Sequence, residues 1–129
     1  MSETNSARNR FVWMDIPVAD LQRAIAFYRE VGGMGVHYEH HEGFEFAVLD
    51  HVDEGNGACL VVDPGAISSA HGPLVYLNVA GRIRDAVKRV APLGGKVTQD
   101  VHSIGPYGFR ALIIDCEGNR LALHSPTDE

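Results

Sequence analysis

The pattern of hydrophobic and polar positions along this chain predicts short strands interrupted by two helices. Residues 10–18 are rich in β-branched and aromatic side chains, and their even-numbered and odd-numbered positions form two different faces. Trp13, Asp15 and Pro17 share the odd-numbered face. The segment is therefore predicted to be a strand whose two faces have different roles.

Two helices are expected from apolar residues that recur at helical spacing. The first follows Asp20, whose carboxylate is suited to cap a helix, and runs to about Val31 before the pair Gly32-Gly33 ends it. The second is predicted over 83–93 and is again ended by two glycines. Further strands are predicted at 35–40, 44–50, 58–62, 73–79, 96–102, 108–114 and 120–124.

Three segments of the first half return in the same order in the second half, at offsets of 62, 65 and 63 positions. AIAFYREVGG (24–33) returns as AVKRVAPLGG (86–95), GFEFAVLD (43–50) as GFRALIID (108–115), and EGNGACL (54–60) as EGNRLAL (117–123). Self-similarity at a nearly fixed period indicates two copies of one structural unit.

Each half follows the order βαβββ, which places the chain in the α+β class. The predicted divisions are an N-terminal tail (1–9), a first module (10–62), a linker rich in Pro, Gly and Ser (63–72) and a second module (73–124), all within one domain. One helix per module covers one sheet face. The two modules are therefore expected to form an open half-barrel of mixed sheet, with the helices outside and a cleft on the inner face.

Composition narrows the class of partner. The chain has 129 residues, of which 45% are hydrophobic, enough for a packed core. A net charge of -6 argues against a nucleic-acid partner, and the lack of an apolar run of about 20 residues argues against a membrane partner. The N-terminal residues lack the apolar core of a secretory signal, so we expect a cytoplasmic location and two reduced cysteines.

The residues also resemble a known family. A strand, a short turn, Asp20-Leu21, the sequence AFY and a glycine pair, repeated once and closed by the sequence D-x-E-G-N-R-L, are similar to the vicinal oxygen chelate superfamily. That superfamily includes glyoxalase I, bleomycin-resistance proteins, fosfomycin-resistance enzymes and extradiol dioxygenases. The resemblance covers about residues 10–124 and implies the open barrel. It leaves the function open, because the members differ in their chemistry.

Catalytic members of the superfamily hold a divalent metal with His, Glu or Gln at four places, on the first and last strand of each repeat. Carried over to this chain, the four places hold Trp13, Leu74 or Val75, Cys59, and Ala122. Only the thiol of Cys59 offers a donor atom, and one thiolate does not make a metal site. The resemblance therefore predicts a member without the usual metal ligands, and no cofactor is expected.

We take the four metal places to face the cleft. Other residues on the same faces of these strands then face the cleft too. Strand alternation then places Trp13, Asp15, Tyr76, Asn78 and His124 on its lining. Asp15 and His124 are candidate catalytic acid–base groups if they face each other across the cleft, because an imidazole can exchange a proton near neutral pH. The alternative for His124 is a hydrogen bond to the backbone near the C-terminus.

The connection 103–108, SIGPYG, is longer than its counterpart in the first half and is expected to present Tyr107 at the tip of a turn. Tyr107 then stacks on a ligand, or the segment is a plain hairpin turn or a dimer contact. Arg110 follows shortly after. If it faces inward, it is suited to bind a carboxylate or phosphate of the ligand, and if outward it is surface charge.

Two functions remain open. The first is a glyoxalase/bleomycin-resistance-like protein that binds a small aromatic or amphipathic molecule between Trp13, Tyr76 and Tyr107 without metal. The alternative is a lyase, isomerase or dioxygenase of the glyoxalase I type that uses a noncanonical metal or Asp15 and His124. A homodimer is expected, because superfamily members commonly pair and an open barrel leaves exposed sheet edges.

Overall fold

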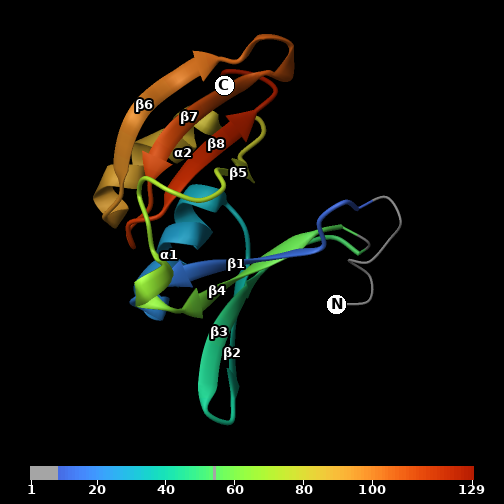
Figure 1. The fold of residues 1–129 in the computed structure, drawn as a ribbon. Helices are drawn as coiled ribbons and strands as arrows, with labels where there is room; N and C mark the ends of the chain where they lie inside the picture. Colours follow the sequence, from blue (N-terminus) through green and yellow to red (C-terminus); the bar gives the residue numbers. More distant parts are fainter. Residues whose placement is uncertain (1–8, 54) are drawn as a thin grey trace.

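The computed structural model of the chain describes residues 9–53 and 55–129, which form two βαβββ modules (Figure 1). The first module comprises β1 (Trp13–Val18), α1 (Leu21–Gly32), β2 (Val36–His41), β3 (Phe44–Leu49) and β4 (Gly57–Val62). The second comprises β5 (Val75–Asn78), α2 (Ile83–Val90), β6 (Lys96–Ser103), β7 (Phe109–Ile114) and β8 (Arg120–Ser125). Short 3-10 turns lie at Pro64–Ala66, Ala91–Leu93 and Gly105–Tyr107. Apart from Asn9, the predicted tail lies outside the described residues.

Each module contributes one four-stranded sheet. The strand orders are β1-β4-β3-β2 in the first sheet and β5-β8-β7-β6 in the second. The pairs β1/β4 and β5/β8 are parallel and the other neighbours are antiparallel, so both sheets are mixed. Neither sheet closes into a barrel. The predicted α+β architecture of two repeated modules is confirmed.

In the first strand of each module, β1 and β5, buried and exposed side chains alternate as predicted. In β1, Ile16 and Val18 are buried in the core, whereas Asp15 on the opposite face is exposed. In β5, Leu77 is buried and Tyr76 is half exposed. We call the face of each sheet that points away from the helices its outer face. It is the face that the sequence prediction placed on the inside of the half-barrel, lining the cleft. Both outer faces therefore carry the side chains that the sequence assigned to the cleft.

The predicted helix boundaries are close to those observed. The Asp20 carboxylate accepts a hydrogen bond from the Arg23 amide at 3.1 Å, and Gly33 ends α1 with a left-handed φ of 64°. The second helix is shorter than predicted, because α2 ends at Val90 and residues 91–93 form a 3-10 turn. Pro92 has no N–H to continue the helical hydrogen bonds, which accounts for the change.

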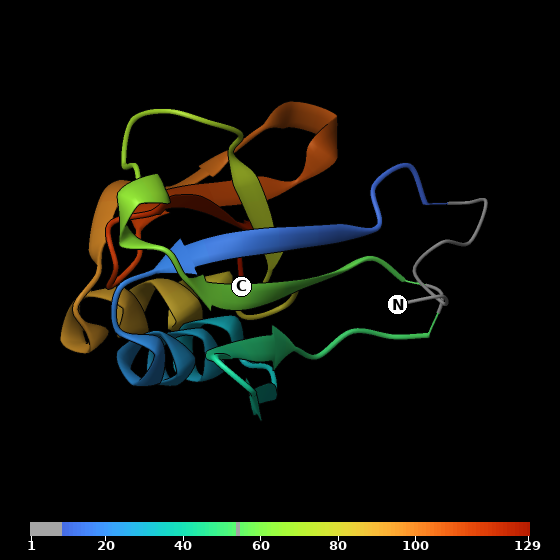
Figure 2. The ribbon, with the colours of Figure 1, turned by 60° about the horizontal axis from the view of Figure 1, so that its bottom comes forward.

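The two helices pack against each other, as Figure 2 shows from below, and join both modules in one hydrophobic core. The guanidinium of Arg82 at the start of α2 donates to the Val31 carbonyl at 2.8 Å and to the Glu30 carbonyl at 3.2 Å, at the end of α1. Phe27 and Ile83, one from each helix, are fully buried. None of the helices in the described part of the chain is long and apolar enough to cross a bilayer.

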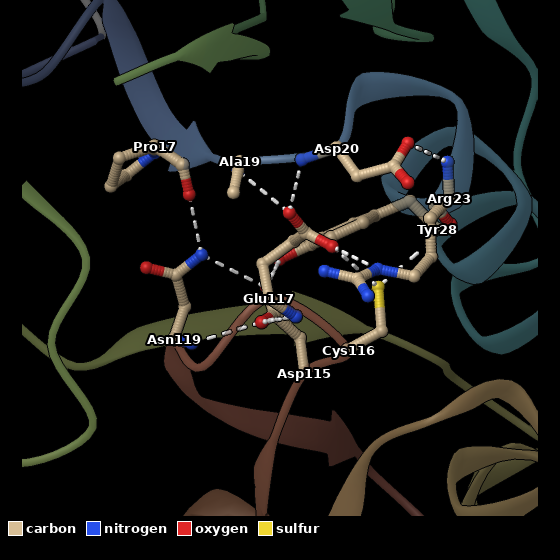
Figure 3. Close-up of polar contacts among 9 residues, drawn as sticks. All are labelled: Pro17, Ala19, Asp20, Arg23, Tyr28, Asp115, Cys116, Glu117 and Asn119. Atoms are coloured by element: carbon tan, nitrogen blue, oxygen red, sulfur yellow. Dashed lines mark hydrogen bonds and ion pairs between the residues drawn. The ribbon is translucent and has the colours of Figure 1, made fainter. Parts of the chain in front are cut away.

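The turn between β7 and β8 fastens the second module to the first (Figure 3). Glu117 is 9% exposed, and its Oε1 accepts hydrogen bonds from the amides of Ala19 and Asp20, both at 2.6 Å. Its Oε2 accepts from Nε of Arg23 at 2.5 Å. Burial raises the pKa of Glu117, but the hydrogen bonds from Arg23 and the two amides, with the charge of Arg23, outweigh burial and lower it overall.

A second set of contacts in the same turn centres on Asp115, which is 2% exposed. Its carboxylate accepts from the Tyr28 hydroxyl at 2.7 Å and from the amides of Glu117 and Asn119 at 2.8 and 2.9 Å. The Asn119 side chain donates to the Pro17 carbonyl at 2.7 Å. Burial and the negative charge of Asp115 raise the pKa of Tyr28 well above its ordinary value. The turn between β7 and β8 therefore has a structural role: its side chains hold the two modules together.

Candidate functional site

The outer face of the second sheet gathers polar and aromatic side chains from four neighbouring strands. Arg110 on β7 lies opposite His124 on β8 and His102 on β6. On the other side of β8, Tyr76 and Asn78 of β5 lie opposite Ala122 and His124. These side chains share a face because Leu77, Ala111 and Leu123, their alternating neighbours, are buried in the core.

A cavity of about 530 Å³ lies on this face, and we call it the second-sheet pocket. Its lining residues come from β5, β7, β8 and the connection between β6 and β7: Tyr76, Ile104, Tyr107, Arg110 and His124. The structure thus brings together four residues that the sequence singled out.

Two hydrogen bonds hold the guanidinium of Arg110 at the pocket. Nη1 donates to the Tyr76 hydroxyl at 2.7 Å, and Nε donates to Nε2 of His102 at 3.0 Å. Nδ1 of His102 lies 2.8 Å from the Asp100 carbonyl, which only accepts. His102 therefore carries its proton on Nδ1 and accepts from Arg110 as a neutral imidazole. The inward orientation of Arg110 is the one that favours recognition of an anion.

His124 is hydrogen-bonded to the backbone, as the alternative interpretation of this residue supposed, and it also lines the pocket. Its Nε2 lies 2.7 Å from the Tyr107 carbonyl, which only accepts, so Nε2 carries a proton and donates it to that carbonyl. Its ring meets that of Tyr76 edge-on, with centroids 6.1 Å apart. The bond ties the 3-10 turn Gly105–Tyr107 to β8, and Nδ1 is the ring nitrogen that takes no part in it.

The candidate catalytic partner Asp15 lies on the other sheet. Its Oδ1 accepts from the Cys59 thiol at 3.3 Å, and the Cys59 sulfur accepts from Nε1 of Trp13 at 3.3 Å. Within the described residues, no hydrogen bond joins Asp15 to His124, and Asp15 lines a cavity of about 200 Å³ that is separate from the second-sheet pocket beside His124. One chain therefore does not assemble the predicted acid–base pair.

Trp13 meets two other predicted ligand-binding residues in a separate cavity of about 300 Å³ between the modules. Tyr76 and Asn78 contribute to the wall of this cavity, together with Met14 and Met34. Tyr76 lies at both cavities. The structure consequently divides the predicted ligand residues into two groups that share this one tyrosine.

The four places that hold the superfamily's metal do not offer a suitable donor set. Val75 packs against the core, so Leu74 is the outward counterpart of Trp13, and neither side chain can coordinate a metal. Burial raises the pKa of the Cys59 thiol to about 11, which keeps it protonated at neutral pH. Among the residues described, no three His, Cys, Asp or Glu side chains are grouped in a way that could hold a metal ion.

The sequence interpretation missed His102 and Ile104. His102 lies opposite Arg110 only because the pairing of β6 with β7 shifts register twice, between Val97 and Gln99 and between Gln99 and His102. Such irregularities leave no alternation pattern in the sequence. The extra length of SIGPYG was the available signal for Ile104.

Comparisons with known proteins agree with this fold. The structure resembles a hypothetical protein of S. aureus (TM-score 0.69, 15% identity, covering 88% of this chain and 92% of that one). It also resembles the fosfomycin resistance protein FosX of Listeria monocytogenes (TM-score 0.66, 12% identity, 89% and 91% covered). Against glyoxalase I of Zea mays the TM-score is 0.69 at 20% identity, and 92% of this chain covers 48% of that protein. These identities establish the fold alone.

No curated protein matches the sequence. The sequence profile of one family does match, over residues 10–123, which is most of the chain and includes both modules. That span contains the repeated AFY and glycine-pair segments from which the resemblance was first drawn. The chain therefore belongs to the Glyoxalase/Bleomycin resistance protein/Dioxygenase superfamily.

Proposed function

We propose that this protein binds a small, aromatic or amphipathic organic molecule in the second-sheet pocket without the metal that catalytic relatives use. The observation that carries the proposal is the convergence of Tyr76, Tyr107, Arg110 and His124 on one cavity of about 530 Å³. Small-molecule sites are typically concave, largely apolar and supplied with a few polar groups that orient the ligand. The pocket combines these properties.

The residues at the four metal places support the proposal that binding needs no metal. Side chains without lone pairs occupy three of the four metal places, and the fourth is a protonated thiol engaged with Trp13 and Asp15. A ligand must therefore be held by hydrogen bonds, charge and stacking. Bleomycin-resistance-like sequestration fits such a site better than metal-assisted chemistry.

Native mass spectrometry and metal analysis of the purified protein test this proposal. We expect less than one equivalent of any divalent metal, and a screen of small aromatic compounds by ¹H–¹⁵N NMR should shift the amide signals of Arg110, Tyr107 and His124. One equivalent of zinc, nickel, manganese or iron per chain would overturn the metal-free assignment. Shifts confined to the cavity beside Trp13 would place the ligand elsewhere.

An enzyme of the lyase, isomerase or dioxygenase type is the second candidate, and the geometry of His124 is the observation in its favour. The Tyr107 carbonyl fixes the proton on Nε2, so Nδ1 can accept a proton from a substrate. His124→Ala is expected to abolish turnover and retain binding if this candidate holds. Unchanged turnover in that variant would exclude His124 as the base.

We further propose that the protein is a homodimer in which the first sheet of one copy faces the second-sheet pocket of the other. The outer face of the first sheet carries Asp15 and Glu39, and that of the second carries Arg120 beside the pocket residues, so the two faces are complementary in charge. Sedimentation analysis should give twice the chain mass, and a monomer at tens of micromolar would contradict the pairing.

The cytoplasmic location expected from the sequence belongs to the same proposal. Cys59 and Cys116 are both free thiols, as expected of a protein in a reducing compartment. Fractionation of the native cells tests this point.

A further inference from the structure

We propose that the ligand of the second-sheet pocket is a monocarboxylate with a ring-sized apolar body, and that Arg110 binds its carboxylate. This inference rests on the proposed function, namely that the pocket holds a small molecule. It adds the charge and the chemical class of that molecule.

The first argument is that Arg110 lacks the acidic partner that four other arginines have. Arg23 pairs with Glu117, Arg84 with Asp128, and Arg82 and Arg89 both pair with Asp85. Like Arg10, Arg29 and Arg120, Arg110 has no carboxylate within 4.0 Å among the residues that the structure describes. Of these four arginines, only Arg110 lines the second-sheet pocket. It is nevertheless half-buried at the wall of a cavity. A partly desolvated cation without a counter-charge is a ready site for an anionic ligand.

The second argument concerns the neighbours that hold Arg110. Both groups that accept hydrogen bonds from its side chain, the Tyr76 hydroxyl and Nε2 of His102, are neutral. They fix the direction of the guanidinium and leave its charge uncompensated. Since the Tyr76 oxygen accepts from Arg110, its own proton is available to a ligand. Arg110 and Tyr76 thus offer two adjacent donors, which match the two oxygens of a carboxylate.

The charge balance selects the type of anion. The described lining contains one permanently charged side chain, the guanidinium of Arg110. One positive charge compensates a monoanion and leaves a phosphate dianion half compensated. The observations therefore favour a carboxylate.

The rest of the pocket defines the body of the ligand. Tyr107 and Ile104 from the β6–β7 connection and the ring of Tyr76 supply apolar walls. A volume of about 530 Å³ is much larger than a carboxylate group needs, so the anion must be attached to an apolar group that fills the remainder. Aromatic rings pack well against tyrosines in offset or edge-on arrangements.

The test compares two probes of one shape, 2-naphthoate and the neutral 2-naphthamide, by NMR titration and calorimetry of the full chain. We expect the carboxylate to bind the wild-type protein about tenfold or more tightly than the amide, because a hydrogen bond to a charged group adds to affinity. In Arg110→Gln the carboxylate should weaken about ten- to hundredfold and the amide hardly at all. Arg84→Gln removes an equal charge from an exposed position and should change neither affinity.

The outcomes separate the two proposals. Equal affinity of both probes, with signals shifting around the pocket, overturns the carboxylate assignment and leaves the pocket as a ligand site. No binding of either probe at the pocket overturns the proposed function and this inference together. If Arg110→Gln fails to fold in a thermal unfolding control, Arg110→Lys decides the matter: it keeps the charge, loses the fork, and should weaken naphthoate about threefold to tenfold and leave naphthamide unchanged.

Discussion

The same repeated aspartate has opposite surroundings in the two modules. GFEFAVLD ends in Asp50, which is exposed and contacts the Gly35 amide and the ring of His37. GFRALIID ends in Asp115, which is buried and accepts from Tyr28, Glu117 and Asn119. The repeat conserves the residue type, while tertiary packing gives only the second copy the task of joining the modules. A repeated motif thus predicts a shared local turn and not a shared role.

Replacing the two aspartates separately gives the largest expected effect. Asp115→Ala should lower the free energy of unfolding by about 3 kcal/mol, because it leaves a buried hydroxyl, a side-chain amide and two backbone amides without their acceptor. Asp50→Ala is the matched control and should cost less than about 1 kcal/mol, as for other exposed pairs. Urea denaturation of both variants measures the difference. Equal losses would show that the two turns contribute alike.

The second prediction concerns the pH dependence of stability that follows from the contacts of Glu117 between the two modules. Since the folded-state pKa of Glu117 lies below its ordinary value of 4.5, its stabilisation is complete above that value and is lost as the pH falls through the lower, folded-state pKa. Glu117→Gln should cost about 2 kcal/mol at pH 7, since a hydrogen bond to a charged group is lost, and should flatten the acid limb of a plot of stability against pH. Unfolding midpoints between pH 3 and pH 7 test this. An acid limb as steep as that of the wild-type protein would contradict the assignment.

Much of this fold could be predicted because its signals are local. Asp20 and Gly33 lie at the two ends of α1 as expected, since capping depends on neighbouring backbone groups. Alternation in β1 and β5 identified the outer faces, because side chains in a strand change face at each residue. The short α2 was missed at its last turn, where Pro92 acts against the apolar pattern.

The site was less predictable because it depends on register and on how the modules pack. Tyr76, Tyr107, Arg110 and His124 were identified individually, yet only the structure places them at one pocket. His102 was missed because two register shifts in β6 decide which residue meets Arg110. Asp15 and His124 were candidates for acid–base work on the condition that they face each other across the modules, and among the described residues no hydrogen bond joins them.

The third prediction compares two exposed tyrosines, one from each module. Tyr107→Ala should weaken binding of 2-naphthoate about three- to tenfold, because the aromatic wall of the pocket is lost. Tyr38→Ala on β2 removes an exposed ring from the first module, away from the second-sheet pocket, and should leave affinity unchanged. Calorimetric titration measures both. A larger loss in the Tyr38 variant would move the ligand to the first sheet.

The smallest effect is expected at Cys59, which differs from its counterpart in the second module, Ala122, only by its sulfur atom. Cys59→Ala makes the first module match the second and removes a sulfur that accepts from Trp13 and donates to Asp15. Both bonds are long and involve a weak donor and acceptor, so the loss should be about 0.5–1 kcal/mol by urea denaturation. Metal content should not change, since a thiol with a pKa of about 11 is almost wholly protonated at neutral pH and coordinates metal poorly. A metal bound by the wild-type protein and lost in this variant would show instead that the first module retains a coordinating position that the second has given up.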